Sequence, residues 1–159
     1  NIGAEAGRLA KAFGCRVIAT RRSATEVTSE PYADEVMPAS QLDRLLRESD
    51  YVVLSMPLTS ETRGMIAAPQ LRAMKPTALL VNIARGPVVV EADLLRALSE
   101  GWIAGAALDV FDQEPLPATA AFRDVPNLIL SPHLAGLTEE SAARISQVVA
   151  RAVREVLAR

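Results

Sequence analysis

A short apolar run with an abrupt polar ending places the strongest constraint on the fold. The stretch ALLVNIARGPVV, residues 78–89, is apolar until Asn82 and Arg85, and Gly86 and Pro87 follow directly. Short apolar runs bounded by turn residues are typical of buried strands in parallel sheets. In open α/β sheets the ligand binds just beyond the carboxyl ends of such strands. The sequence therefore places a cation, Arg85, where such a protein would bind an anion.

Similar apolar runs alternate with helical patterns along the chain. Strands are predicted at residues 15–20, 51–55, 78–83, 102–110 and 128–130, with a brief one near 35–37. Helices are predicted at residues 2–13, 40–47, 69–74 and 91–99, and a last one begins near 138. Ser40 and Asp43 are expected to form a capping box at the second of these helices. Strands alternating with helices imply βαβ units with right-handed crossovers. The predicted fold class is α/β, a doubly wound, Rossmann-like parallel sheet.

Composition narrows the functional classes. With 159 residues, half of them apolar, one ordinary globular domain is expected. A formal net charge of -2 argues against a general nucleic-acid partner. No apolar run approaches the roughly 18 residues of a membrane span, and nothing resembles a signal peptide, so no membrane partner is expected. A single cysteine excludes an internal disulfide framework and favours a cytoplasmic location.

The first residues match the end of a dinucleotide-binding fingerprint. In the pattern G-x-G-x-x-G, Gly3 would be the third glycine, and Asn1 and Ile2 would be the two spacer residues. The first strand and the first two glycines would then be missing, upstream of residue 1. Gly3 could equally be an ordinary glycine at the start of a helix, so the fingerprint depends on support from elsewhere in the chain.

The tip of the next predicted strand offers that support. About 20 residues beyond the glycines, this fold places an acid that binds the ribose of NAD or an arginine that accommodates the 2′-phosphate of NADP. The chain has Thr20, Arg21, Arg22 and Ser23 there, without an acid. Guanidinium groups bind phosphate bidentately, and hydroxyl groups add further donors. The two arginines either select NADP(H) or are a solvated pair in a loop.

Three chemically active side chains, Arg85, Glu114 and His133, each follow a predicted strand. His133 is the single histidine of the chain and lies in SPHLAG, at a strand-to-helix turn. A lone histidine is usually structural, but imidazole is also the side chain best suited to proton transfer near neutral pH. Glu114 could accept a hydrogen bond from the imidazole, or it could be an exposed loop acid. Asp109 could bind a carboxamide or cap the turn that follows it.

Together these residues resemble the cofactor-binding domain of the D-isomer-specific 2-hydroxyacid dehydrogenases. The resemblance covers essentially the whole chain and is carried by MPLTSETRGMI, MKPTALLVNIARGPVV, GAALDVFDQEPLP and SPHLAGLTEES. Similar members include glyoxylate/hydroxypyruvate reductases, phosphoglycerate dehydrogenases and D-lactate dehydrogenases. Formate dehydrogenases of the same superfamily have glutamine in place of Glu114, so formate is not expected as a substrate.

The resemblance implies a role for each matching residue. Arg85 would bind the substrate carboxylate and polarise the 2-oxo group, His133 would donate or remove the proton, and Glu114 would pair with His133. Hydride transfer to a 2-oxo acid requires such a cation and such an acid beside the nicotinamide. Asp109 would position the nicotinamide ring. The remaining cofactor contacts would come from Asn1, Ile2, Gly3, Met56, Pro57, Ile83, Ala84 and Gly136, and no metal is expected.

The resemblance also implies what the whole protein does. It would be an oxidoreductase that transfers a hydride between NADP(H), or NAD(H), and a small 2-hydroxy or 2-oxo acid such as glyoxylate or hydroxypyruvate. Residues 1–159 would form a dinucleotide-binding domain truncated at both ends, without the substrate-binding domain, and the full-length protein would be a homodimer. Two alternatives stay open: a nucleotide-sensing binding protein like the corepressors that resemble this family, or an inactive fragment.

Overall fold

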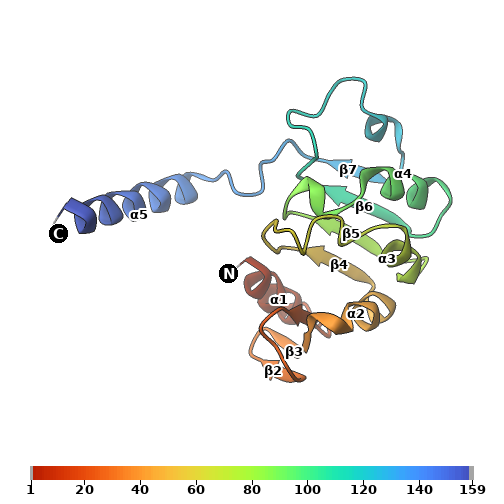
Figure 1. Ribbon diagram of the computed structural model, residues 1–159, viewed down its shortest axis with the longest axis horizontal. Coiled ribbons are helices and arrows are strands. Elements are labelled where there is room, and N and C mark those ends of the chain that lie inside the picture. Colours follow the sequence, from red (N-terminus) through yellow and green to blue (C-terminus); the bar gives the residue numbers. More distant parts are fainter. Residues whose placement is uncertain (1, 158–159) are drawn as a thin grey trace.

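The computed structural model describes residues 2–157, and the strands in this range form two sheets (Figure 1). The first has the order β1–β3–β2, with β1 (Ile18–Arg21) parallel and β2 (Thr28–Glu30) antiparallel to β3 (Ala33–Pro38). The second is all parallel: β4 (Tyr51–Leu54), β5 (Leu79–Asn82), β6 (Gly105–Leu108) and β7 (Leu128–Leu130). The α/β, Rossmann-like fold class is confirmed.

The register of the parallel sheet determines where the chain leaves it. Leu54 pairs with Asn82, Asn82 with Leu108, and Leu108 with Leu130. These four residues end their strands, so all four loops begin at one edge of the sheet. Residues far apart in the sequence are thereby placed side by side.

Helices cover one face of the parallel sheet. They are α2 (Leu42–Glu48), α3 (Ala68–Ala73) and α4 (Glu91–Ser99), while α1 (Ile2–Ala12) packs on the smaller sheet and α5 (Glu139–Leu157) projects away from the body (Figure 1). The core lies between these helices and the sheet, where Leu46, Leu71, Leu80 and Leu94 are completely buried. Each such leucine contributes about 1.5–3 kcal/mol relative to an exposed one.

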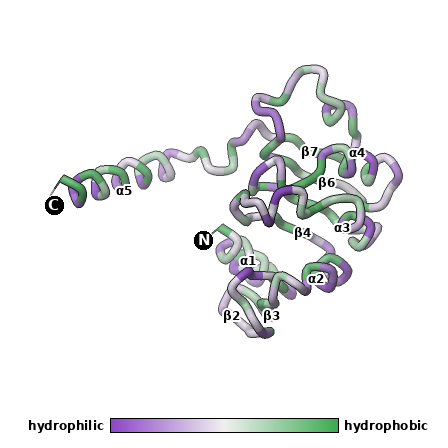
Figure 2. Tube along the Cα trace, viewed as in Figure 1, coloured by the Kyte–Doolittle hydropathy of each residue, from purple (hydrophilic) through white to green (hydrophobic). Residues whose placement is uncertain are grey.

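The opposite face of the parallel sheet is largely open. Tyr51, Val53 and Ile129 are exposed there. The apolar stripe of α5, which includes Ile145 and Val149, is exposed as well, and Figure 2 shows it running along the helix. Within the described residues, no helix combines the length and the apolar character that crossing a bilayer requires.

Three local expectations differ from the structure. The strand β2 was not predicted. The capping box at Ser40 and Asp43 is absent, because a 3-10 turn, η1 (Ala39–Gln41), precedes α2 and Gln41 becomes its N-cap without a side-chain bond. The strand predicted at 102–110 is shorter, because the amide of Trp102 donates to the carbonyl of Ala97 in the turn that ends α4.

Candidate active site

The loops at the carboxyl edge of the parallel sheet gather most of the residues singled out in the sequence. Met56 and Pro57 follow β4, residues 83–85 follow β5, Asp109 follows β6, and His133 follows β7 by three residues. Because the strand ends are in register, these residues share one edge. The edge is where an open α/β sheet binds its ligand.

His133 and Glu114 contact each other directly. The Nδ1 atom of His133 lies 2.7 Å from Oε2 of Glu114, and Oε1 of Glu114 accepts a 3.0 Å hydrogen bond from the amide of Phe111. The hydrogen bond from His133 is the main reason that the pKa of Glu114 lies below its ordinary value, and the charge of Arg85 lowers it further. Glu114 is therefore ionised at neutral pH and able to fix the tautomer of the imidazole.

Arg85 is exposed at the same edge. Its Nη1 donates a 2.6 Å hydrogen bond to the carbonyl of Ala84, which folds the guanidinium back toward its own strand end. The next residue, Gly86, touches the loop that leads to Glu114: a Cβ added there would lie 2.0 Å from the carbonyl carbon of Phe111. Only glycine permits this approach. Gly86 thus brings the turn of Arg85 against the loop of Glu114.

Two buried polar side chains hold the turns at this edge. Asn82, 1% exposed, accepts a hydrogen bond from the amide of Ala84 and donates one to the carbonyl of Arg85, at 3.0 and 3.1 Å. Asp109 is also buried, and its carboxylate accepts hydrogen bonds from Ser131, Leu134 and Ala135. Burial alone would raise the pKa of Asp109, but these three bonds hold its pKa below the ordinary value.

Two hollows flank the turn that carries His133. One of about 320 Å³ lies on the open side of the sheet, with Val81, Ile83 and Asp109 in its wall. The other, of about 590 Å³, lies against Glu114 and His133 on the side of the loop after β6. The first hollow has mainly apolar walls and one buried carboxylate, a composition typical of small-molecule sites.

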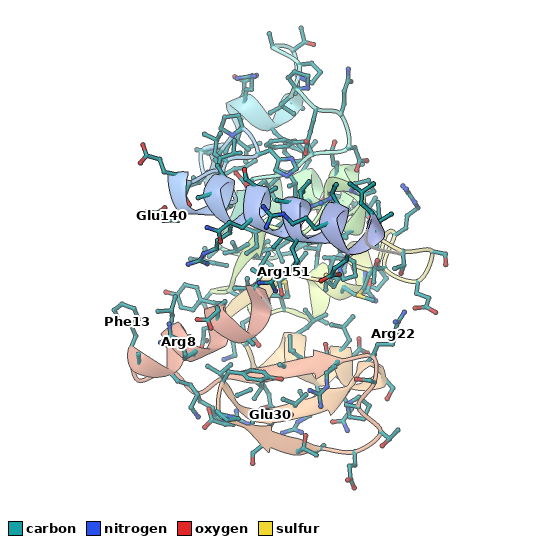
Figure 3. The ribbon with its side chains drawn as sticks, turned by 90° about the vertical axis from the view of Figure 1, so that its left-hand side faces the viewer. Arg8, Phe13, Arg22, Glu30, Glu140 and Arg151 are labelled. Carbon is teal, nitrogen blue, oxygen red and sulfur yellow. The ribbon has the colours of Figure 1, made fainter. Side chains whose placement is uncertain are left out.

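The two arginines at the end of β1 are both paired with acids. Nη1 of Arg21 lies 3.3 Å from Oε1 of Glu30 and 3.4 Å from the hydroxyl oxygen of Tyr32. Arg22 is more exposed and extends toward the loop after β4, where its Nη1 lies 3.5 Å from Oε2 of Glu61 (Figure 3). The sequence placed no acid at this strand tip, yet the fold brings Glu30 there from β2.

The other predicted cofactor positions come from the start of α1, the loop after β4 and the turn after β7. Ile2 and Gly3 are in the first turn of α1, and Asn1 lies outside the described residues. Met56 is partly buried against the core. Gly136 follows the turn of His133 and has open space around it. Their roles stay predictions.

Three residues that arrange the site were not identified from the sequence. They are Glu30, Ser131, and Asn82 in its role of holding the turn of Arg85. Glu30 could not be found because it belongs to an unpredicted strand. Asn82 did carry a signal: a polar residue that ends an apolar strand is buried, and buried polar groups are almost always hydrogen-bonded. For Ser131, the only signal in the sequence was its position two residues before the single histidine.

The parallel sheet and its helices define a Rossmann-type domain. Its carboxyl edge holds a cation, Arg85, the hydrogen-bonded pair of Glu114 and His133, and an open apolar hollow. Side chains of these types are suited to acid–base chemistry. The chain belongs to the D-isomer specific 2-hydroxyacid dehydrogenases, and residues 1–135 match the NAD binding domain of that family.

Relatives and solved structures agree with this assignment. Glyoxylate reductases from Korarchaeum cryptofilum and Thermococcus gammatolerans are 46% and 47% identical over 149 and 152 residues. Each match covers 94% of this chain and 44% of the relative, so the chain spans less than half the length of these relatives.

Two solved structures resemble the fold closely. An NADPH-dependent glyoxylate/hydroxypyruvate reductase from Sinorhizobium meliloti, in complex with NADP and sulfate, has a TM-score of 0.83 and 32% identity, covering 96% of this chain and 49% of that one. An NAD-complexed D-isomer specific 2-hydroxyacid dehydrogenase from Lactobacillus delbrueckii has a TM-score of 0.80 and 32% identity, covering 92% and 47%.

Proposed function

We propose that residues 1–159 form the dinucleotide-binding domain of an oxidoreductase that reduces a small 2-oxo acid, such as glyoxylate or hydroxypyruvate, with NADPH or NADH. The main support for this proposal is the 2.7 Å contact between His133 and Glu114, at the sheet edge where Arg85 also lies. The two glyoxylate reductases and the two solved structures are named for acids of this class. A homodimeric full-length protein belongs to the same proposal.

The residues present fit a nicotinamide dinucleotide. Ile2 and Gly3 offer backbone amides at the start of α1, where a helix N-terminus favours phosphate. The hollow walled by Val81, Ile83 and Asp109 suits the nicotinamide ring at the sheet edge. When bound there, the reduced cofactor would supply the hydride.

This chain would supply the charges that the reaction needs. Arg85 would bind the carboxylate of the 2-oxo acid and polarise its ketone, since guanidinium matches carboxylate geometry. His133 would donate a proton to the oxygen that becomes the alcohol. The ionised Glu114 would hold the imidazole in place and stabilise its charged form. A positioned acid of this kind accelerates a reaction about 10²–10⁴-fold.

The cofactor preference rests on Arg21 and Arg22. Both guanidinium groups are exposed at the end of β1, where an adenosine ribose would lie, and both are paired with acids at 3.3 Å or more. A 2′-phosphate could replace those acids as the partner, which favours NADPH over NADH.

Steady-state turnover tests the proposal. The protein that carries this chain is expected to consume NADPH when glyoxylate or hydroxypyruvate is added, and His133→Asn is expected to lower kcat about 10²–10⁴-fold. Binding of NADPH without turnover of either acid would instead favour a nucleotide-sensing protein.

A further inference from the structure

His133 has an unusual backbone conformation. Its φ is 56°, and among residues 2–157 it is the one non-glycine residue with a positive φ. Side chains with a Cβ rarely adopt this left-handed region, and such residues persist only where the surrounding structure holds them. Something around His133 must therefore fix the turn.

The carboxylate of Asp109 is bonded to donors on both sides of His133. Its Oδ1 accepts from the hydroxyl of Ser131 at 2.5 Å and from the amide of Leu134 at 2.8 Å, and its Oδ2 accepts from the amide of Ala135 at 2.9 Å. Ser131 lies two positions before His133, and Leu134 and Ala135 are the two residues that follow it. One carboxylate thus spans the whole turn.

Asp109 is itself firmly anchored. Its side chain is 5% exposed, and its amide donates a 3.0 Å hydrogen bond to the carbonyl of Asn82 at the end of β5. Ser131 is tied to the same sheet, because its amide donates to the carbonyl of Leu108 at 2.9 Å. The turn of His133 is therefore fixed to the ends of β5 and β6.

We propose that Asp109 and Ser131 together are positioning residues for His133: they hold its left-handed turn and so keep Nδ1 against Glu114, leaving the other ring nitrogen for the substrate. This inference deepens the proposed dehydrogenase function and rests on it for the role of His133. It gives Asp109 a task within the protein that is separate from any contact with the nicotinamide ring, and it assigns a role to Ser131.

Ser131→Ala tests the inference most directly, and Ser131→Thr is the conservative variant for comparison. Ser131→Ala removes one hydroxyl from a partly exposed residue, so we expect the fold to be retained. Asp109→Asn replaces one carboxylate oxygen with an NH₂ group. This group is itself a donor, so it cannot accept the hydrogen bonds that the carboxylate accepts. Ser99→Ala is the matched control, because it removes a hydroxyl that donates to the carbonyl of Arg96 at the exposed end of α4.

The first readout is independent of catalysis. A proton held between the imidazole Nδ1 and a carboxylate gives a low-field proton NMR resonance, assigned here by its absence in Glu114→Gln and His133→Asn. We expect Ser131→Ala and Asp109→Asn to lose or broaden this resonance, and Ser131→Thr and Ser99→Ala to retain it. A resonance unchanged in both Ser131→Ala and Asp109→Asn would overturn the inference.

The second readout separates positioning from general stability. In the full protein, Ser131→Ala is expected to lower kcat for glyoxylate about tenfold, a part of what a positioned acid provides, with KM for NADPH and glyoxylate nearly unchanged. Ser131→Thr should restore kcat. Equal loss in Ser131→Ala and Ser131→Thr, or a rise in KM alone, contradicts a positioning role. If the wild-type protein reduces neither glyoxylate nor hydroxypyruvate while the resonance responds as described, the proposed function is wrong. The positioning of His133 by Asp109 and Ser131 is then still supported.

Discussion

The backbone amide of Asp109 donates a 3.0 Å hydrogen bond to the carbonyl of Asn82, which joins the end of β6 to the end of β5. These are the two buried polar residues among residues 2–157. The side chain of Asn82 clamps the turn of Arg85, and that of Asp109 clamps the turn of His133. The turns of Arg85 and His133 therefore share one anchor in the sheet, and changes at the anchor should affect both.

Asn82→Ala should destabilise the protein and weaken substrate binding. It leaves the buried amide of Ala84 without its partner, and an unsatisfied buried group costs about 1–3 kcal/mol, while the carbonyl of Arg85 keeps only its 3.2 Å hydrogen bond from the amide of Val88. We expect an unfolding free energy lower by about 1–3 kcal/mol in urea titrations. KM for glyoxylate should rise, because Arg85 loses its fixed turn.

Asn127→Ala is the matched control for this variant. Asn127 makes one side-chain bond, to the carbonyl of Ala104 at the other end of the sheet, in an exposed setting. Its loss should cost about 1 kcal/mol and leave KM unchanged. Equal effects of the two variants on KM would contradict the account of Asn82.

Gly86→Ala should separate the turn of Arg85 from the loop of Glu114. The new Cβ would lie 2.0–2.4 Å from three backbone atoms of Phe111 and Asp112, and backbone cannot yield as a flexible side chain can. We expect a loss of at least about 1–3 kcal/mol in thermal or urea unfolding. Gly136→Ala, at a position with open space, should unfold like the wild type. Similar stabilities for the two variants would argue against close packing at Gly86.

Glu114→Gln should make stability less sensitive to acid. The pKa of Glu114 in the folded protein lies below its ordinary value of 4.5, chiefly because of the hydrogen bond from His133. A carboxyl with a depressed pKa stabilises the fold above its unfolded pKa, and this contribution is lost as the pH falls through the folded value. Urea midpoints measured from neutral pH to below 4.5 should therefore fall less steeply in Glu114→Gln. An equally steep fall in both proteins would contradict the pairing.

Glu30→Gln should shift cofactor preference toward NADPH. Glu30 holds Nη1 of Arg21 at 3.3 Å and would repel a 2′-phosphate bound to that guanidinium. Removing its charge is expected to lower the Kd for NADPH more than the Kd for NADH, measured by quenching or calorimetry. Arg21→Ala should have the opposite effect, because it removes the cation itself. If Glu30→Gln changes both Kd values equally, Arg21 does not bind the phosphate.

The α/β architecture and the edge that holds the site could be predicted because both depend on local patterns. The strands other than β2 were predicted to within a few residues, and the helix at Glu91–Ser99 and the strand at Leu128–Leu130 have the predicted bounds. Since parallel strands end at one edge, polar residues after each strand had to meet there. Arg85 and His133 were recognisable for this reason.

The contacts that arrange the site could not be predicted. The side chain of Asp109 accepts hydrogen bonds from residues 22–26 positions away, so these donors depend on the register of the sheet and on the turn of His133. Glu30 escaped notice because the short strand β2 has no apolar alternation. The capping box at Ser40 failed because Pro38 and η1 delay the start of α2, and a local motif cannot show that delay.

The most direct test of the central claim follows the hydride. The protein that carries this chain would be incubated with glyoxylate and with NADPH labelled with deuterium at the transferred position, and the product would be examined by NMR. We predict deuterium on the carbinol carbon of glycolate with the wild type, and little product with His133→Asn. Glycolate without deuterium, or equal labelled product from both proteins, would contradict the account.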